Sequence, residues 1–226
     1  ILLDGTAVQL VGEAPGSNFE LAVRAAGSIG DFVLRTGHRV TLVTHERNHR
    51  EMRLTADGDL ERAGQVSFAG AGLTSLGEYA GQFQFVAEDK AYFFDGSTAQ
   101  VIVWNPEEMT YTKSLDLSSL VFDGELLTFG GVPLRVGGEL LAFAGWRTND
   151  NAQVPDRAAV ILVDTETDAV TIATDERCGY VRDGVLAEDG FVYLATEAFG
   201  AAVHHMNEEN ASPPCLLRFD PEAGEF

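Results

Sequence analysis

One short phrase recurs along this chain: an apolar, β-branched run followed at once by a polar turn that begins with Asp or Asn. Its clearest copy lies within residues 159–173, where residues 160–163 form the apolar run and residues 164–168 form the turn. A second β-rich run follows at residues 170–172, and two such runs around a short polar turn predict a β-hairpin. Further copies lie at residues 101–108 and 216–222, with a fainter copy at residues 52–58.

The phrase belongs to a longer repeat. The strands that follow the first turn of each set begin near Arg39, Ala91, Leu140 and Phe191, a spacing of roughly 50 residues. This period is typical of the four-stranded antiparallel blades of a β-propeller, whereas the sets of a β-sandwich need not repeat. We therefore predict an all-β fold with about four blades, and, because a closed ring needs more, we expect the chain to be part of a larger propeller.

The predicted blades are residues 30–68, 82–117, 134–173 and 184–226, and the last of them lacks its fourth strand. Residues 1–16 hold one strand of a neighbouring blade, at residues 7–11. Further strands are expected at residues 31–34, 52–54, 82–86, 91–94, 101–104, 111–117 and 140–143. No sustained helical periodicity is present. Because the chain starts at Ile1 and ends at Phe226 just after a turn, we expect it to be excised from a longer protein.

The charge balance limits the classes of partner. Acidic residues outnumber basic ones 35 to 15 in this chain of 226 residues, so its net charge is -20. That charge opposes binding to phosphate backbones, and we expect no nucleic-acid partner. It also fits high solubility or adaptation to salt. No apolar run is long enough to span a bilayer.

Blade topology predicts which loops share a face. The loop between the second and third strands of a blade lies on the same face as the link to the next blade, and this face usually binds the ligand. The loops in question are residues 44–50, 95–100, 146–157 and 197–214.

Two of these loops carry most of the histidines. Imidazole, thioether and carboxylate groups suit copper, zinc or iron, so a transition-metal site is one hypothesis. Polar loops also collect histidines without any metal, and two adjacent histidines in a loop cannot easily bind one ion. The candidate metal ligands are His45, His49, His204, His205 and Met206.

The same loops carry arginines and two aromatic residues. Guanidinium groups bind carboxylate or catecholate oxygens in bidentate fashion, and Trp146 and Phe199 could stack on a flat ligand. The alternative is that the arginines pair with nearby surface acids. The candidate arginines are Arg47, Arg50, Arg147 and Arg157.

The two cysteines, Cys178 and Cys215, both fall on the predicted ligand face. A disulfide that pins the loop at residues 197–214 is feasible and would indicate an oxidising, extracytoplasmic compartment. Two separate thiols remain the alternative. Two cysteines are too few for a disulfide scaffold.

Catalytic motifs are absent from the sequence. It contains no G-x-S-x-G elbow, no H-E-x-x-H, no C-x-x-C and no phosphate-cradling glycine loop. The leading hypothesis is therefore a non-enzymatic binding protein. Its alternatives are a propeller enzyme of lactonase or quinoprotein-like type, with a metal or cofactor in the channel, and a pure interaction scaffold.

Several blade phrases resemble a known family. Leu10-Val11-Gly12, residues 40–43, residues 91–94 and Asn105-Pro106-Glu107 resemble the extracytoplasmic propellers linked to myxochelin-type siderophore clusters, within the broader YVTN and quinoprotein-like propellers. The resemblance implies a seven- or eight-bladed periplasmic or outer-membrane-anchored lipoprotein whose secretion signal this chain lacks. It also implies a role in ferric-siderophore handling, with a small molecule or an envelope protein as the partner.

Overall fold

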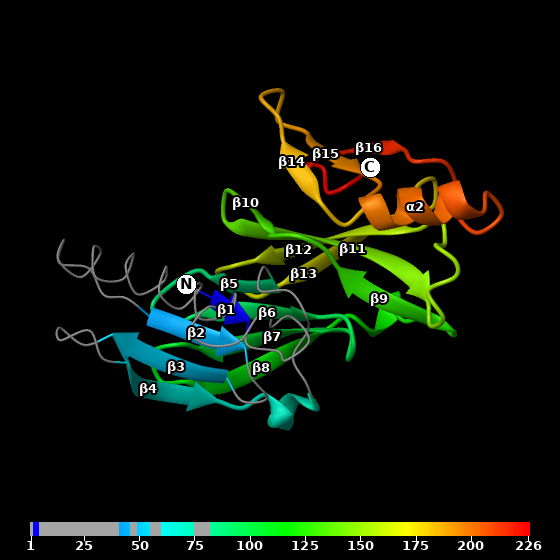
Figure 1. Ribbon diagram of the computed structural model, residues 1–226. Helices are drawn as coiled ribbons and strands as arrows, with labels where there is room; N and C mark the ends of the chain where they lie inside the picture. Colours follow the sequence, from blue (N-terminus) through cyan, green and yellow to red (C-terminus); the bar gives the residue numbers. More distant parts are fainter. Residues whose placement is uncertain (1, 5–40, 46–48, 55–59, 75–81) are drawn as a thin grey trace. The chain divides into compact units, whose positions relative to one another are not determined.

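The computed structural model describes residues 2–4, 41–45, 49–54, 60–74 and 82–226. The chain divides into two compact units, Ile1–Ala80 with Trp104–Tyr111, and Gly81–Val103 with Thr112–Phe226. As predicted, the described part is mostly β, with antiparallel sheets and few helices (Figure 1). The strands predicted at residues 7–11 and 31–34 lie outside the described residues.

The first sheet has the order β1-β2-β3-β4. Its strands are β1 (Leu2–Asp4), β2 (Thr41–His45), β3 (His49–Leu54) and β4 (Leu60–Val66). Strand β1 pairs with β2 in parallel, and the other neighbours are antiparallel. Strand β3 begins earlier than the predicted start at Met52, because the hairpin ladder continues through polar residues, pairing Thr44 with Arg50.

The second sheet is a meander, a sheet whose consecutive strands are neighbours, with the order β5-β6-β7-β8. Its strands are β5 (Phe83–Phe85), β6 (Ala91–Asp95), β7 (Gln100–Asn105) and β8 (Thr110–Asp116). These bounds lie within one or two residues of the sequence expectation, because each strand is delimited by a turn with strong local chemistry.

The third sheet has the order β10-β11-β12-β13 and one extra strand, β9, that pairs with β11. Its strands are β9 (Glu125–Phe129), β10 (Leu134–Val136), β11 (Glu139–Thr148), β12 (Ala158–Asp164) and β13 (Val170–Asp175). Strand β9 pairs with the second half of β11 and β10 with the first half. The sequence analysis missed β9, and it ended the partner strand β11 too early, at Phe143.

The fourth sheet has the order β14-β15-β16. Its strands are β14 (Gly184–Leu186), β15 (Val192–Ala195) and β16 (Leu216–Phe219). Between β15 and β16 the chain forms the helix α2 (Ala198–Met206), which the sequence analysis did not predict. Short 3-10 turns lie at Ala69–Ala71 and Ser118–Leu120.

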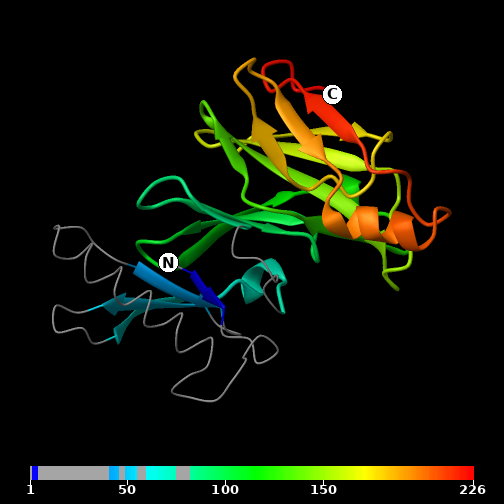
Figure 2. The same cartoon turned by 45° about the horizontal axis from the view of Figure 1, so that its top comes forward.

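The third sheet is buried on both faces. Alternate residues of β11 and β12 belong to two different apolar clusters: Ala142 and Ile161 pack with the second sheet, whereas Phe143 and Val160 pack with the fourth. Because side chains alternate across a strand, a continuous apolar run indicates a sheet covered on both sides. Figure 2 shows these three sheets from a second direction.

The recurring phrase of the sequence is one repeated turn. A strand-terminal Asp or Asn accepts a hydrogen bond from the backbone N–H three residues later, at 2.8 Å for Asp95 and 2.7 Å for Asp164. The next residue has a positive φ: 49° at Ala99, 54° at Met109, 62° at Asp168 and 70° at Gly224. Asn105 and Asp220 begin the other two copies. Such side-chain-to-backbone bonds end a strand through residues that are close in the chain, so these turns can be predicted from the sequence.

Candidate functional site

Three segments at the same end of the third and fourth sheets are in direct contact, and we call them together the loop face. The first is residues 146–157, which comprise the end of β11 and the loop to β12. The second is residues 176–183, between β13 and β14, and the third is residues 196–215, between β15 and β16. The backbone N–H of Val154 donates to the carbonyl of Asn210 at 2.8 Å. The N–H of Glu197 donates to the carbonyl of Tyr180 at 3.1 Å, and Ser212 Oγ lies 2.5 Å from Asp156 Oδ2. In Figures 1 and 2, α2 lies beside the loop that leads into β12.

Helix α2 is held on the loop face by a small apolar cluster. Val203 packs with Val154, Tyr180 and Ala211, and the rings of Tyr180 and Phe199 lie 4.9 Å apart between centroids. Gly200 lets the helix approach closely, because a Cβ there would lie 2.8 Å from Thr196 Cγ2. These contacts compensate for the helix's short length, nine residues, and for its missing side-chain cap.

The end of this segment is tied to the link at residues 176–183. Cys215 forms a disulfide with Cys178, with the two Cα atoms 6.0 Å apart. Thr196 bridges the same place: its N–H donates to the Cys215 carbonyl at 3.0 Å, and its Oγ1 donates to the Gly179 carbonyl at 3.2 Å. Of the two states that the sequence left open, the structure contains the bonded one.

A buried arginine fixes the link to the third sheet. The Arg182 side chain is 8% exposed and lies 2.5 Å from Glu197 Oε2 through Nη2. Its Nη1 donates to the Phe129 carbonyl at 3.2 Å, and its guanidinium lies 4.0 Å from the centre of the Tyr180 ring. The Nε atom has no hydrogen-bond partner among the described residues. Because a buried cation is costly without a partner, the carboxylate of Glu197 compensates the charge of Arg182.

The candidate ligand-binding residues do not form one exposed site. Trp146 is fully buried, its Nε1 donates to the Leu120 carbonyl at 2.9 Å, and its ring is part of the core. Arg157 pairs with Glu125 at 2.5 Å and lies 3.6 Å from the centre of the Phe122 ring. Arg147 bonds to the Asn151 side chain. The sequence predicted a loop that begins at Trp146, whereas Trp146 and Arg147 belong to the end of β11. It also could not tell which side chains turn inward.

The candidate metal ligands are also divided. His204 Nδ1 bonds to the Ala211 carbonyl at 2.8 Å, whereas His205 and Met206 are exposed at the end of α2. Arg47 lies outside the described residues, as do the side chains of Arg50, His45 and His49. In the part of the chain that the structure describes, no group of three or more His, Cys, Asp or Glu residues could hold a metal ion.

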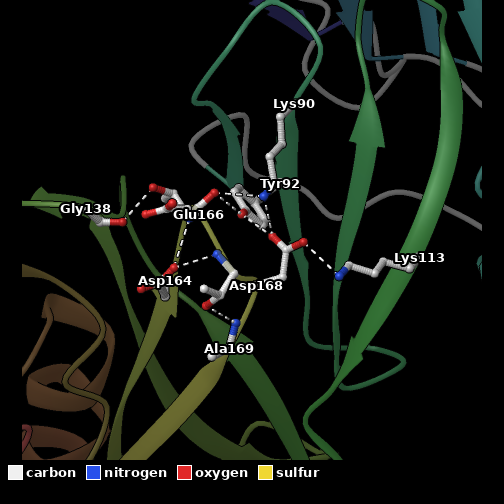
Figure 3. A network of polar contacts seen from close by, with 10 residues as sticks. Lys90, Tyr92, Lys113, Gly138, Asp164, Glu166, Asp168 and Ala169 are labelled. Carbon is white, nitrogen blue, oxygen red and sulfur yellow. Dashed lines mark hydrogen bonds and ion pairs between the residues drawn. The ribbon is translucent and has the colours of Figure 1, made fainter.

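A second polar centre, at the opposite end of β12, was not predicted. Asp168, in the turn between β12 and β13, pairs with Lys90 and Lys113 at 2.8 Å each (Figure 3). The Tyr92 hydroxyl donates to Asp168 Oδ1 at 2.5 Å. The signal available in sequence was that these are the two lysines of the chain, but nothing local assigns both to one carboxylate.

This network shifts two pKa values. Burial, and then the hydrogen bond to Asp168, raise the pKa of the Tyr92 hydroxyl well above its ordinary value. Burial alone would raise the pKa of Asp168, but hydrogen bonds from Lys113, Lys90 and Tyr92 outweigh it, so this pKa lies below the ordinary value. The centre therefore ties the second sheet to the third through the Asp168 carboxylate, which accepts a hydrogen bond from the neutral Tyr92 hydroxyl and pairs with Lys90 and Lys113.

Comparison with known proteins gives weak structural neighbours. No family model and no curated sequence matches the chain. A protein of unknown function from Bacteroides caccae is similar in structure, with a TM-score of 0.42, 10% identity, and coverage of 83% of this chain and 61% of the other. The WD40 domain of SCAP from fission yeast is similar with a TM-score of 0.30, 9% identity, and coverage of 81% and 52%. The chain thus spans less than two thirds of either neighbour. Among the described residues, no helix is long and apolar enough to cross a membrane.

Proposed function

We propose that the sheets are blades of a β-propeller of seven or eight blades, of which this chain supplies about four. The support is the repeated meander order, the repeated Asp or Asn turn, and the face-to-face packing of the second, third and fourth sheets through two apolar clusters. The siderophore-cluster-linked type of propeller stays a prediction within this proposal.

We propose further that the loop face is a non-catalytic docking surface for a positively charged segment of a protein partner. The observation that carries this proposal is the distribution of charge on a surface whose segments are held together by direct contacts. Seven acids and four arginines lie in the three segments, and each arginine already has a partner. The excess charge therefore lies with acids.

Six of the seven acids are exposed, and two of these, which are adjacent in the sequence, lie just after α2. Glu208 and Glu209 are exposed and form no ion pair with another described residue, and Met206, which is 80% exposed, lies next to them. An exposed methionine beside unpaired carboxylates suits an apolar side chain flanked by lysine or arginine. Because the disulfide and the cluster around Val203 hold α2 in place, a partner binds a surface that is already ordered.

The proposed location is extracytoplasmic, in the periplasm or anchored at the outer membrane as a lipoprotein. The disulfide between Cys178 and Cys215 supports it, since disulfides persist in oxidising compartments. A ferric siderophore or another metal complex at the loop face stays a prediction. It needs cations that are available to an anionic ligand, and the four described arginines of this face are already engaged.

A peptide-binding assay tests the docking surface. The oxidised chain is immobilised and exposed to synthetic peptides that combine one apolar anchor with several lysines or arginines, and to the same peptides with acidic replacements. We expect saturable binding of the basic peptides alone, weakened by salt because the charges are exposed. Glu208→Lys with Glu209→Lys should abolish binding.

The control reverses an equivalent pair of adjacent exposed acids, Glu107→Lys with Glu108→Lys, in the turn between β7 and β8. This variant should bind like the wild type. Equal loss in both variants would show a general charge effect and contradict the proposal. Titration with a ferric catecholate, followed by its own absorbance because Trp104 and Trp146 are both buried, tests the siderophore alternative.

A further inference from the structure

The disulfide joins one half-buried position to one fully buried position. Cys178 is 1% exposed and belongs to the apolar cluster between the third and fourth sheets. Cys215 is half-buried, and its Sγ lies 3.9 Å from the carbonyl of Arg177, whose side chain is 66% exposed. A reductant can therefore reach the bond from the Cys215 side, at the border of the loop face.

Cys215 is also the residue at which the helical segment ends, because β16 begins at Leu216. The segment starts at Thr196, which lies against Cys215 through two hydrogen bonds, Thr196 N–H to the Cys215 carbonyl at 3.0 Å and Cys215 N–H to Thr196 Oγ1 at 3.2 Å. Both ends of the segment thus meet at one point, and the disulfide is the covalent tie between that point and the link at residues 176–183.

We propose that the Cys178–Cys215 disulfide is a redox-controlled latch that holds α2 in its binding position on the loop face. The latch rests on the proposed docking function of this face. With the bond formed, the surface around Met206 and Glu208 is fixed; with the bond reduced, the segment at residues 196–215 loosens and docking is lost.

The reduction uses a dithiol of the kind that exchanges with protein disulfides. One thiolate attacks Cys215 Sγ, the bond to Cys178 breaks, and Cys178 leaves as a thiolate that takes up a proton. The second thiol then attacks the mixed disulfide, which releases Cys215 as a thiol and closes the reductant into a disulfide. Two electrons and two protons pass from the reductant to the protein.

The effect is local because of where each sulfur lies. A buried free cysteine behaves as a small apolar side chain, so Cys178 can stay in its cluster after reduction. The strands β11 and β12 are covered on both faces and do not depend on the bond. The segment at residues 196–215 keeps its hydrogen bonds, the ion pair of Glu197 with Arg182, the packing of Cys215 and the small cluster around Val203. It therefore has fewer apolar contacts than β11 and β12, which places it among the less stable parts of the fold.

Hydrogen exchange of the full chain, with and without a dithiol, tests the latch without needing any partner. We expect the amides of α2 to exchange about tenfold faster or more after reduction, while the amides of β11 and β12 keep their protection. A variant with Cys178→Ala and Cys215→Ala should show the fast exchange in both conditions. Re-oxidation of the wild type should restore slow exchange.

Two exchange results would overturn the latch. One is an unchanged exchange rate of the α2 amides after reduction. The other is an equal loss of protection in α2, β11 and β12, which would show that the disulfide stabilises the whole fold. Peptide binding then separates the two proposals. Binding by the oxidised chain alone supports both, and equal binding in both redox states contradicts control by the latch. If the oxidised chain binds none of the peptides, the docking function fails, while the exchange data still decide whether the disulfide governs α2.

Discussion

The third and fourth sheets are built from the same kind of strand but are packed differently. In the third sheet, β11 and β12 bury consecutive side chains, whereas in the fourth sheet, β15 and β16 bury alternate ones. Val185 and Leu216 on the outer side of the fourth sheet are 68% and 65% exposed. Apolar burial supplies most of the stability of a β-sheet, so the fourth sheet depends more on the disulfide and on the contacts of the loop face.

The largest expected effect comes from removing a buried side chain from the third sheet, which is covered on both faces. Trp146→Ala should lower the free energy of unfolding by about 4 kcal/mol, because it removes a buried ring and leaves the Leu120 carbonyl without its donor. Leu216→Ala, on the open side of the fourth sheet, should change it by less than about 0.5 kcal/mol. Denaturant unfolding measures both, and similar losses would break the comparison.

A second change tests how closely the link at residues 176–183 lies against β11. Gly145→Ala would place a Cβ 3.0 Å from the Tyr180 Cα, which is backbone and cannot rotate away. We expect a loss of about 2 kcal/mol from this overpacking. Gly138→Ala is the matched control, because nothing lies within 4 Å of the added Cβ. Thermal unfolding of both variants should separate them; equal midpoints would contradict the close contact.

The polar centre at Asp168 gives a third, pH-dependent test of how the second and third sheets are joined. Asp168→Asn should cost about 1–2 kcal/mol near neutral pH, a modest value because Lys113 is 47% exposed and its charge is screened by solvent. Since the folded-state pKa of Asp168 is lowered, its contribution is full above the unfolded-state pKa and disappears as the pH falls through the folded-state pKa.

The measurement for Asp168 is the difference in unfolding free energy between wild type and variant across acidic and neutral pH. That difference should shrink toward zero at low pH. Glu166→Gln, which removes an exposed carboxylate from the same turn, should show little difference at any pH. A cost for Asp168→Asn that does not depend on pH would show that its charge is not what joins the sheets.

The smallest effect compares equivalent turns of the second and fourth sheets. Met109 and Gly224 hold the same turn position at φ values of 54° and 70°. Met109→Gly should stabilise the chain by about 0.5 kcal/mol, because glycine adopts this conformation without a steric penalty. Gly224→Ala should destabilise it by about 1 kcal/mol for the converse reason. Changes of the same sign would show that the two turns are not equivalent.

Much of the strand pattern could be predicted because its signals are local. Alternating or continuous apolar runs and Asp or Asn turns specify β6, β7, β12 and β16 without any knowledge of their neighbours. Strand β9 was missed because its role depends on pairing with the far half of β11. Helix α2 was missed because nine residues with a glycine in the first turn carry little helical signal, and its stability comes from the cluster around Val203.

In the candidate site, the contrast between features with local sequence signals and features that depend on distant contacts is larger. The sequence placed Trp146, Arg157 and Phe199 on their segments, yet it could not show that Trp146 and Arg157 face Leu120 and Glu125. The partners that these side chains contact are distant in the sequence and cannot be inferred from their own neighbours in the chain. For the same reason, the convergence of Lys90 and Lys113 on Asp168 left no readable pattern.

The sequence by itself determined the all-β class, the repeat, the turns and the acidic charge, because each depends on residues that are near one another in the chain or on composition alone. Only the tertiary structure decided that Cys178 and Cys215 are bonded, and that the arginines of the loop face are engaged while most of its acids stay exposed. These are contacts between distant segments, whose energies arise when folding brings the partners together and removes water from between them.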